Sequence, residues 1–330
     1  MQVRAWLAVL VAFTGQAALA QPVAPAATHD VAITAIPGVM AATATWQLVW
    51  QGTDNADGLV GTADGGVLFA QEQPRRVANL SANGEYSVVV TDTHGVGALS
   101  MTADGRLFGV ERTCTDPGRR TGGECTEPTA VSLLLPQRQV LADQFNGQPL
   151  GRLNDLVVHG SGGVFFTVGG AYYVDRTGKV TSLGEDLSTN GIMLSPNERT
   201  LYVTNRDVVV AFDVAADGAT SNRRDFAKLA AGGTGDGVAI DAAGRVYVTS
   251  QPGVQVFAAD GTYLGLIGTP RPVISAAFSG PGKKRLYAVG SGAALGPNGA
   301  EFVTPEGVRN NAKTIYRIDM LAGGFVGRPK

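Results

Sequence analysis

The stretch GRLNDLVVHGSGGVFFTVGG, at residues 151–170, decides the fold. It begins with a polar pair, Asn154 and Asp155, which is followed by an apolar run at 156–158. A glycine-rich turn at 161–163 leads into a second apolar run at 164–166. A polar tip, a strand, a glycine turn and a second strand are typical of a β-hairpin.

The same plan recurs along the chain. Six apolar runs, each followed by a turn and a second apolar run, begin at Asp57, Gly97, Asn154, Asn190, Asp236 and Ser275. Their starts lie 36 to 57 residues apart, and weaker hairpins at 172–183 and 254–267 lie between some of them. Each repeat therefore holds about four strands, as propeller blades do. The sequence predicts an all-β fold, a six-bladed β-propeller, in preference to a β-sandwich.

The chain divides into three parts. Residues 1–20 read as a signal peptide, residues 21–44 as a leader segment that is disordered in part, and residues 45–330 as a single propeller domain. The first outer strand is expected at 46–51. The last strand, at 314–320, should share a blade with it and so close the ring.

The expected signal peptide rests on three features. Arg4 supplies a positive charge, residues 5–13 are apolar, and Ala18-Leu19-Ala20 forms an A-x-A cleavage site. We therefore expect an exported protein, periplasmic or secreted, with no membrane anchor in the mature form.

Charge and cysteine content narrow the partners. Lys and Arg total 26 and Asp and Glu total 28, so nothing favours nucleic acid, and a small-molecule substrate is expected instead. Cys114 and Cys125 flank a loop rich in Gly, Arg and Thr. In an exported protein such a pair indicates a disulfide, with a metal-binding pair as the alternative.

The residues that begin the inner strands should converge on one mouth of the propeller channel. Two carboxylates, Asp57 and Asp236, and two carboxamides, Asn154 and Asn190, belong to this set. Their oxygens suit a hard cation, Ca²⁺ first, with Mg²⁺ or Mn²⁺ as substitutes and Zn²⁺ a poorer one because no His or Cys joins the ring. Asn and Asp also start turns for structural reasons alone, and that alternative stays open for each residue taken singly.

Four motifs resemble the SMP-30/gluconolactonase/LRE-like family of six-bladed propellers. They are LADQFNGQPLGRLNDLVV at 141–158, NGIMLSPNERTLYVTNR at 190–206, GDGVAIDAAGRVYVTS at 235–250 and GVQVFAADGTYLG at 253–265. The resemblance spans residues 46–320.

This resemblance implies one divalent cation, usually Ca²⁺, at the channel floor, with Asn154, Asn190 and Asp236 as ligands. The family's fourth ligand, a Glu, falls on Asp57, which keeps the charge but is one methylene shorter. Gly97 stands where many relatives carry Asn, a loss expected to enlarge the mouth.

The resemblance also implies hydrolysis of a lactone, a cyclic ester. The cation would polarise the carbonyl, Asp236 would act as general base on water, and Asp155 would orient its neighbours. Ser275, where relatives often carry Asn, is a weaker candidate for contacting substrate. The alternatives are a non-catalytic periplasmic ligand-binding propeller and a phosphotriesterase-like hydrolase.

Other polar residues are weaker candidates. His94 precedes a mouth position and could hydrogen-bond substrate, although a solvated loop histidine is an equal alternative. Glu111 and Arg112 follow the second strand of their repeat and could reach a substrate carboxylate or hydroxyl if the chain doubles back. Their place at the far end of the strand favours a solvated loop instead. No G-x-S-x-G motif occurs, which disfavours a serine hydrolase.

Overall fold

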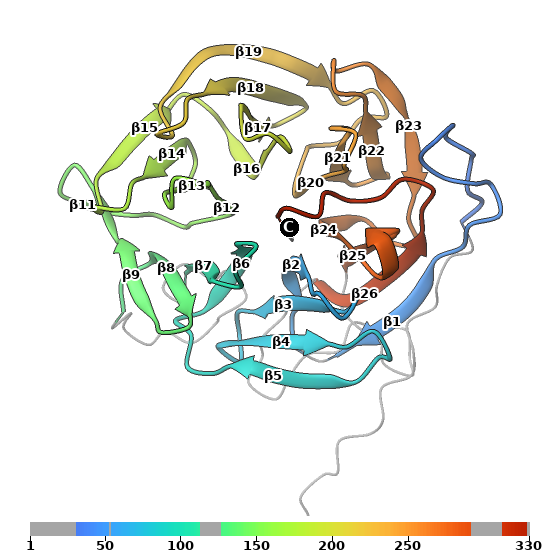
Figure 1. Ribbon diagram of the computed structural model, residues 1–330, viewed down its shortest axis with the longest axis horizontal. Helices are drawn as coiled ribbons and strands as arrows, with labels where there is room; N and C mark the ends of the chain where they lie inside the picture. Colours follow the sequence, from blue (N-terminus) through green and yellow to red (C-terminus); the bar gives the residue numbers. More distant parts are fainter. Residues whose placement is uncertain (1–30, 53, 113–126, 292–311, 329–330) are drawn as a thin grey trace, which may run out of the picture.

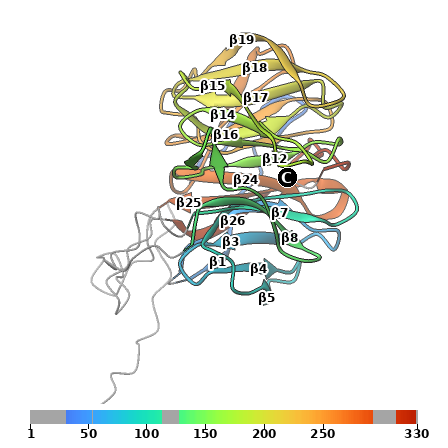
Figure 2. The same ribbon diagram turned by 90° about the vertical axis from the view of Figure 1, so that its left-hand side faces the viewer.

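The computed structural model describes residues 31–52, 54–112, 127–291 and 312–328. Six four-stranded antiparallel sheets surround one axis, as Figure 1 shows, and this confirms the predicted six-bladed propeller. Figure 2 shows the ring from its side, with the sheet of residues 189–228 at one rim and the sheet of residues 57–90 at the opposite rim.

Blades 1 to 3 use consecutive strands of the chain. Blade 1 contains β2 (Asp57–Gly61), β3 (Val67–Gln71), β4 (Arg76–Leu80) and β5 (Tyr86–Val90). Blade 2 contains β6 (Val96–Met101), β7 (Leu107–Glu111), β8 (Ala130–Leu135) and β9 (Gln139–Ala142). A small hairpin of β10 (Gln144–Phe145) and β11 (Gln148–Pro149) precedes blade 3, which contains β12 (Leu156–Val158), β13 (Val164–Thr167), β14 (Ala171–Val174) and β15 (Val180–Gly184).

Blades 4 and 5 repeat the plan, and blade 6 differs in its last strand. Blade 4 contains β16 (Thr189–Leu194), β17 (Thr200–Asn205), β18 (Val208–Val214) and β19 (Thr220–Lys228). Blade 5 contains β20 (Val238–Ile240), β21 (Val246–Ser250), β22 (Gly253–Phe257) and β23 (Tyr263–Gly268). Blade 6 contains β24 (Val273–Ser279), the 3₁₀ turn η1 (Pro281–Lys283), β25 (Arg285–Ser291), β26 (Ala312–Asp319) and β1 (Gln47–Gln51).

The ring closes through the two ends of the domain. Strand β1 pairs antiparallel with β26, with Leu48 opposite Tyr316, so the N-terminal strand becomes the outer strand of the last blade. This confirms the predicted closure. The pairing stabilises the ring because blades 1 and 6 cannot separate without breaking hydrogen bonds between distant parts of the chain.

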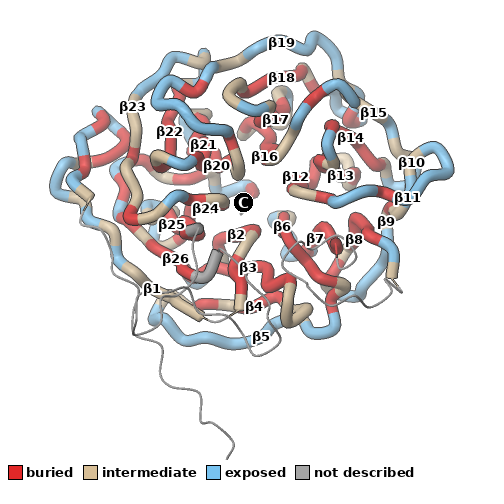
Figure 3. The backbone as a smooth tube through the Cα atoms, turned by 180° about the vertical axis from the view of Figure 1, so that it is seen from behind, coloured by how far each residue is buried: buried red, intermediate tan, exposed pale blue. Residues whose placement is uncertain are grey.

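The core lies between neighbouring blades. One cluster joins Leu59 and Phe69 of blade 1 to Tyr287 and Ile315 of blade 6. The three inner strands of each blade are mostly buried and the outer strands exposed (Figure 3). Within the described part of the chain, no helix is long and apolar enough to cross a membrane.

Part of the expected leader segment belongs to this core. Ile33, Ile36, Val39 and Met40 are buried against residues of blades 5 and 6. These four residues therefore pack on the propeller, and partial disorder of residues 21–44 stays a prediction. Residues 21–30 lie outside the described residues, as do residues 1–20 of the expected signal peptide.

The inner strands are irregular where they meet the channel mouth. The pairing register shifts between Asp57 and Leu59 in blade 1, and similar shifts occur at the start of β6, β16 and β24. A bulge of this kind redirects a side chain and ends regular pairing. These bulges turn the side chains of the mouth residues toward the axis.

A glycine follows three of the mouth residues and lets the blades approach closely. A Cβ on Gly191 would lie 2.1 Å from the carbonyl oxygen of Asp236, and one on Gly237 would lie 2.8 Å from that of Ile274. The Asn-Gly and Asp-Gly pairs therefore serve packing between blades, since only glycine leaves room for the neighbouring backbone.

The opposite end of the channel is covered by the C-terminal segment. Figure 1 shows the segment that follows β26, drawn in dark red, running toward the axis. Gly324 forms a β-bridge with Asp241, and the buried Arg328 donates hydrogen bonds to the carbonyl oxygens of Leu194 and Ser195. These partners lie at the ends of inner strands, so only the other end of the channel, where those strands begin, carries the mouth residues.

Candidate functional site

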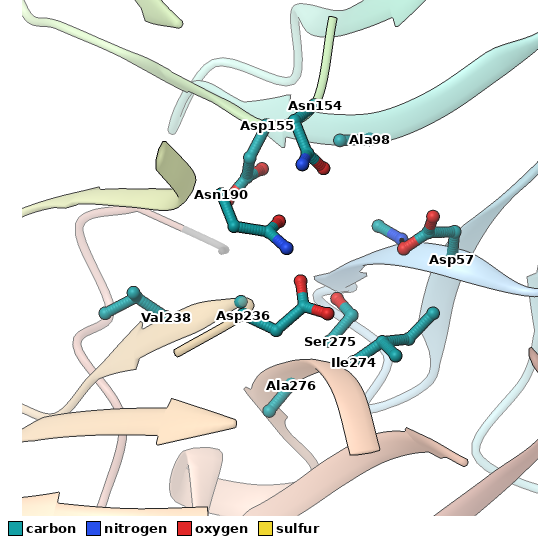
Figure 4. A pocket seen from close by; sticks show the side chains of 12 residues that line it. Asp57, Ala98, Asn154, Asp155, Asn190, Asp236, Val238, Ile274, Ser275 and Ala276 are labelled. Carbon is teal, nitrogen blue, oxygen red and sulfur yellow. Dashed lines mark hydrogen bonds between the residues drawn. The ribbon is translucent and has the colours of Figure 1, made fainter. Parts of the chain in front are cut away.

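The mouth residues of five blades line one small cavity. It has a volume of about 20 Å³, enough for a single ion or water molecule. Its polar wall is formed by Asp57, Asn154, Asp155, Asn190, Asp236 and Ser275. Figure 4 shows the side chains of Asn154, Asn190 and Asp236 directed into the shared space. The structure thus brings together the ring that the repeats predict.

Asp155 ties two blades together beside the cavity. Its Oδ1 accepts a hydrogen bond from the backbone N–H of Leu156 at 2.8 Å, and its Oδ2 accepts one from Ile192 of the next blade at 3.1 Å. Asn154 lies just before the first of those strands, and Asn190 lies on the second. The carboxylate therefore fixes the positions of two candidate ligands, which is consistent with the orienting role that the sequence suggests.

Threonine hydroxyls fix the mouth residues from behind. Thr167 donates to the carbonyl oxygen of Asn190 at 2.6 Å, and Thr204 donates to that of Asp236 at 3.3 Å. Each threonine lies on the second strand of one blade and reaches the first strand of the next. The side chains at the mouth are thereby held by a backbone that cannot shift without losing inter-blade hydrogen bonds.

Arg112 enters the site, contrary to the sequence-based expectation. Its Nη2 lies 2.8 Å from Oδ2 of Asp57, and its Nε lies 2.8 Å from Oε1 of Glu72. Strand β7 runs antiparallel to β6, with Glu111 opposite Val96, so the chain returns to the mouth before Arg112. The favoured interpretation of a solvated loop is therefore wrong for Arg112 and for the buried Glu111, and the alternative, in which the chain doubles back toward the mouth, is correct for Arg112.

The guanidinium also fills the space beside Gly97. A Cβ on Gly97 would lie 2.1 Å from both Cζ and Nε of Arg112. The expectation that Gly97 enlarges the mouth is therefore wrong. Blade 2 contributes an arginine to the ring, supplied from its second strand in place of a side chain on its first.

Asp236 experiences the strongest electrostatic perturbation of the mouth residues. Burial raises the pKa of its carboxyl group well above the usual range, and the nearby charges of Asp57 and Asp155 raise that pKa further. Arg112 opposes these effects. Carboxylates crowded in this way are stabilised by a positive charge placed among them.

The donor set fits a hard divalent cation. The cavity accepts one ion, and the side chains pointing into it offer carboxylate and amide oxygens, the ligands that Ca²⁺ and Mg²⁺ prefer. No group of three or more His, Cys, Asp or Glu residues arranged for metal binding occurs within the ranges described, so the site depends on its two asparagines. Asp57 lines the cavity, but its carboxylate is engaged by Arg112.

Two weaker candidates have other partners. The Oγ of Ser275 accepts a hydrogen bond from the backbone N–H of Leu59 at 3.2 Å, which links blades 6 and 1. The ring of His94 lies between Arg138, 2.9 Å from Nδ1, and Glu127, 3.5 Å from Nε2. Ser275 also lines the cavity, whereas His94 does not.

Cys114 and Cys125 lie outside the described residues. Their disulfide therefore stays a prediction from the sequence.

Comparisons with known proteins agree with this architecture. A gluconolactonase from Zymomonas mobilis subsp. mobilis is 30% identical over 185 residues, which cover 46% of this chain and 52% of that protein. The chain thus spans about half the length of this curated relative. The structure of a gluconolactonase from Xanthomonas campestris superposes with a TM-score of 0.68 at 22% identity, covering 92% of this chain and 98% of the other.

A second solved structure is the calcium-binding protein regucalcin from Agrobacterium tumefaciens strain C58. It superposes with a TM-score of 0.63 at 19% identity, covering 84% of this chain and 95% of the other. At these identities the two structures show a shared fold. The model of the SMP-30/gluconolactonase/LRE-like region matches residues 87–291, more than half of the chain. The chain therefore belongs to the SMP-30/gluconolactonase/LRE-like family.

Proposed function

We propose that this protein is an exported, metal-dependent hydrolase that opens a lactone. The substrate is either the lactone of a sugar acid or another cyclic ester. One observation carries the proposal: Asn154, Asn190 and Asp236, from three blades, line a single cavity of ionic size. Family membership and the likeness to a gluconolactonase support a lactone as the substrate class.

The chemistry follows from the residues at the mouth. A divalent cation held by these residues, Ca²⁺ first, would supply Lewis-acid chemistry at the lactone carbonyl. Asn154 and Asn190 offer amide oxygens as neutral ligands, and Asp236 offers a carboxylate.

Asp236 also acts as the general base. It accepts a proton from water as the water oxygen bonds to the carbonyl carbon, and it returns the proton to the ring oxygen as the carbon–oxygen bond of the lactone breaks. The product is a hydroxy acid. A cation held beside Asp236 would favour the ionised carboxylate, which is the form that can accept a proton from water.

A panel of aldonolactones, acyl lactones and aromatic lactones tests the proposal. Acid release should be observed in a pH-stat for at least one lactone, should stop with EDTA and should return with added CaCl₂. Asp236→Asn should abolish turnover, whereas Asp186→Asn, a matched change at an exposed ion pair on the rim, should preserve it. Activity that survives both EDTA and Asp236→Asn would contradict the mechanism.

A second candidate function is a non-catalytic ligand-binding propeller of the periplasm. The observation that favours it is the ion pair between Asp57 and Arg112, which engages a carboxylate at the cation site. Absence of turnover on the lactone panel and on phosphotriesters, together with no thermal shift on adding CaCl₂, would support this function.

A further inference from the structure

We propose that Arg112 is an internal counter-ion of the mouth and competes with the divalent cation for Asp57. The inference rests on the cation site of the proposed function. It states that the cation is held chiefly by Asn154, Asn190 and Asp236, while Asp57 is reserved for the arginine.

The guanidinium spans three blades. Its Nη2 donates to Oδ2 of Asp57 in blade 1, and its Nη1 lies 3.4 Å from the carbonyl oxygen of Leu153 and 3.5 Å from that of Asn154, which lead into blade 3. Between them it occupies the space beside Gly97 of blade 2. A side chain held by contacts with three blades helps to fix their relative positions.

The other side of the guanidinium is anchored by a buried carboxylate. Nε of Arg112 donates to Glu72, and the two side chains are only 5% and 3% exposed. Arg112 cannot swing into solvent without leaving the charge of Glu72 buried and unpaired, which is costly. The positive charge therefore stays beside Asp57.

Asp57 is held from both oxygens. Its Oδ1 accepts a hydrogen bond from the backbone N–H of Gly58 at 2.8 Å, while Oδ2 faces Arg112. A cation that recruits Asp57 must weaken this ion pair and accept a positive charge close by. Both effects lower the affinity of the mouth for a divalent cation.

The double variant Arg112→Met/Glu72→Gln tests this competition. It removes one positive and one negative charge, so the net charge is unchanged and a buried, unpaired Glu72 is avoided. Calorimetric titration of the purified full chain with CaCl₂ should show affinity raised roughly tenfold or more, because Asp57 becomes available as a ligand. Equal or weaker affinity overturns the proposal.

A second ion pair of blade 2 provides a matched control. Arg138→Met/Glu111→Gln removes a similar pair, in which Arg138 bonds the buried Glu111 but neither residue lines the cavity. Its calcium affinity should equal that of the unaltered protein. A gain of the same size in this control would overturn the proposal, since a distant charge rearrangement would then explain it.

Asp57→Asn completes the cycle. In the Arg112→Met/Glu72→Gln background it should abolish the gain, because the carboxylate that the double variant makes available is then missing. A gain that survives Asp57→Asn, or no calcium binding in any variant, overturns the proposal. Lactone turnover is scored separately, so raised affinity without any turnover would contradict only the proposed function, and turnover with unchanged affinity only this inference.

Discussion

The backbone of Gly97 lies against the guanidinium of Arg112 so closely that a Cβ on residue 97 would lie 2.1 Å from Cζ. The two residues depend on each other: the arginine occupies space that only a glycine leaves free. This relationship makes blade 2 different from its neighbours, and it gives a direct test of the structure of the mouth.

Gly97→Ala should destabilise the protein. The added methyl group must displace Arg112 from Asp57 and from the buried Glu72, and we expect a loss of about 1–3 kcal/mol in the free energy of unfolding by urea. Gly151→Ala is the control, because its Cβ would meet only a methyl group of Val168 at 3.4 Å. Equal stability of the two variants would show that Arg112 does not occupy this space.

Asp236→Asn should abolish activity and stabilise the metal-free protein. Asp236 is crowded by the negative charges of Asp57 and Asp155, and an amide of the same shape removes that repulsion. We expect the free energy of unfolding, measured in EDTA, to rise by about 1 kcal/mol. A lower unfolding midpoint in EDTA would contradict this account of the mouth.

Arg328→Met should loosen the closed end of the channel. Burial lowers the pKa of Arg328 to about 10, yet the side chain keeps its ion pair with Glu198 at 3.0 Å and its hydrogen bonds to two carbonyl oxygens. Loss of these charged hydrogen bonds should cost about 2 kcal/mol of unfolding free energy.

The matched control for this change is Arg224→Met. Arg224 pairs with Asp213 on the exposed face of blade 4, where water screens the interaction. Its thermal midpoint should stay at the value of the unaltered protein. If both arginine variants unfold at the same temperature, the C-terminal segment does not contribute to stability through Arg328.

Stability should fall as the pH is lowered through the titration range of His159. Burial lowers the pKa of this histidine, Arg328 lowers it further and Glu198 partly opposes the shift. At pH values between the pKa of His159 in the folded protein and the ordinary histidine value of about 6.5, this side chain binds more protons in the unfolded chain than in the folded one. Protonation therefore favours unfolding in this range. The stability is therefore fully present above about pH 6.5 and declines below it.

Thermal midpoints measured from pH 8 to pH 5 check this expectation against His159→Gln. The variant should lose the part of the decline that the histidine causes. Identical slopes for the two proteins would assign the acid sensitivity to other groups.

Local sequence pattern was sufficient for the fold and for most of the mouth. Each repeat carries its own alternation of apolar runs and turns, and six copies of such a unit can bury their faces only by packing around an axis. The positions of Asn154, Asn190 and Asp236 follow from that repetition, because each lies within two residues of the start of the inner strand of its blade. Closure by the first and last strands follows in the same way.

The partners of these residues could not be read from the pattern. Arg112 meets Asp57 across 55 residues of chain and Glu72 across 40, through contacts that belong to no repeat. The sequence pattern also gave no sign that residues 31–44 pack against blades 5 and 6, because an Ala- and Pro-rich segment has no hydrophobic period of its own.

The sequence by itself thus determined a six-bladed ring with carboxylate and amide side chains at one mouth. The tertiary structure decided which charge lies among them. The physical reason is that periodicity is a local property, whereas the place of a long side chain such as Arg112 depends on the space that Gly97 leaves and on the buried charge of Glu72.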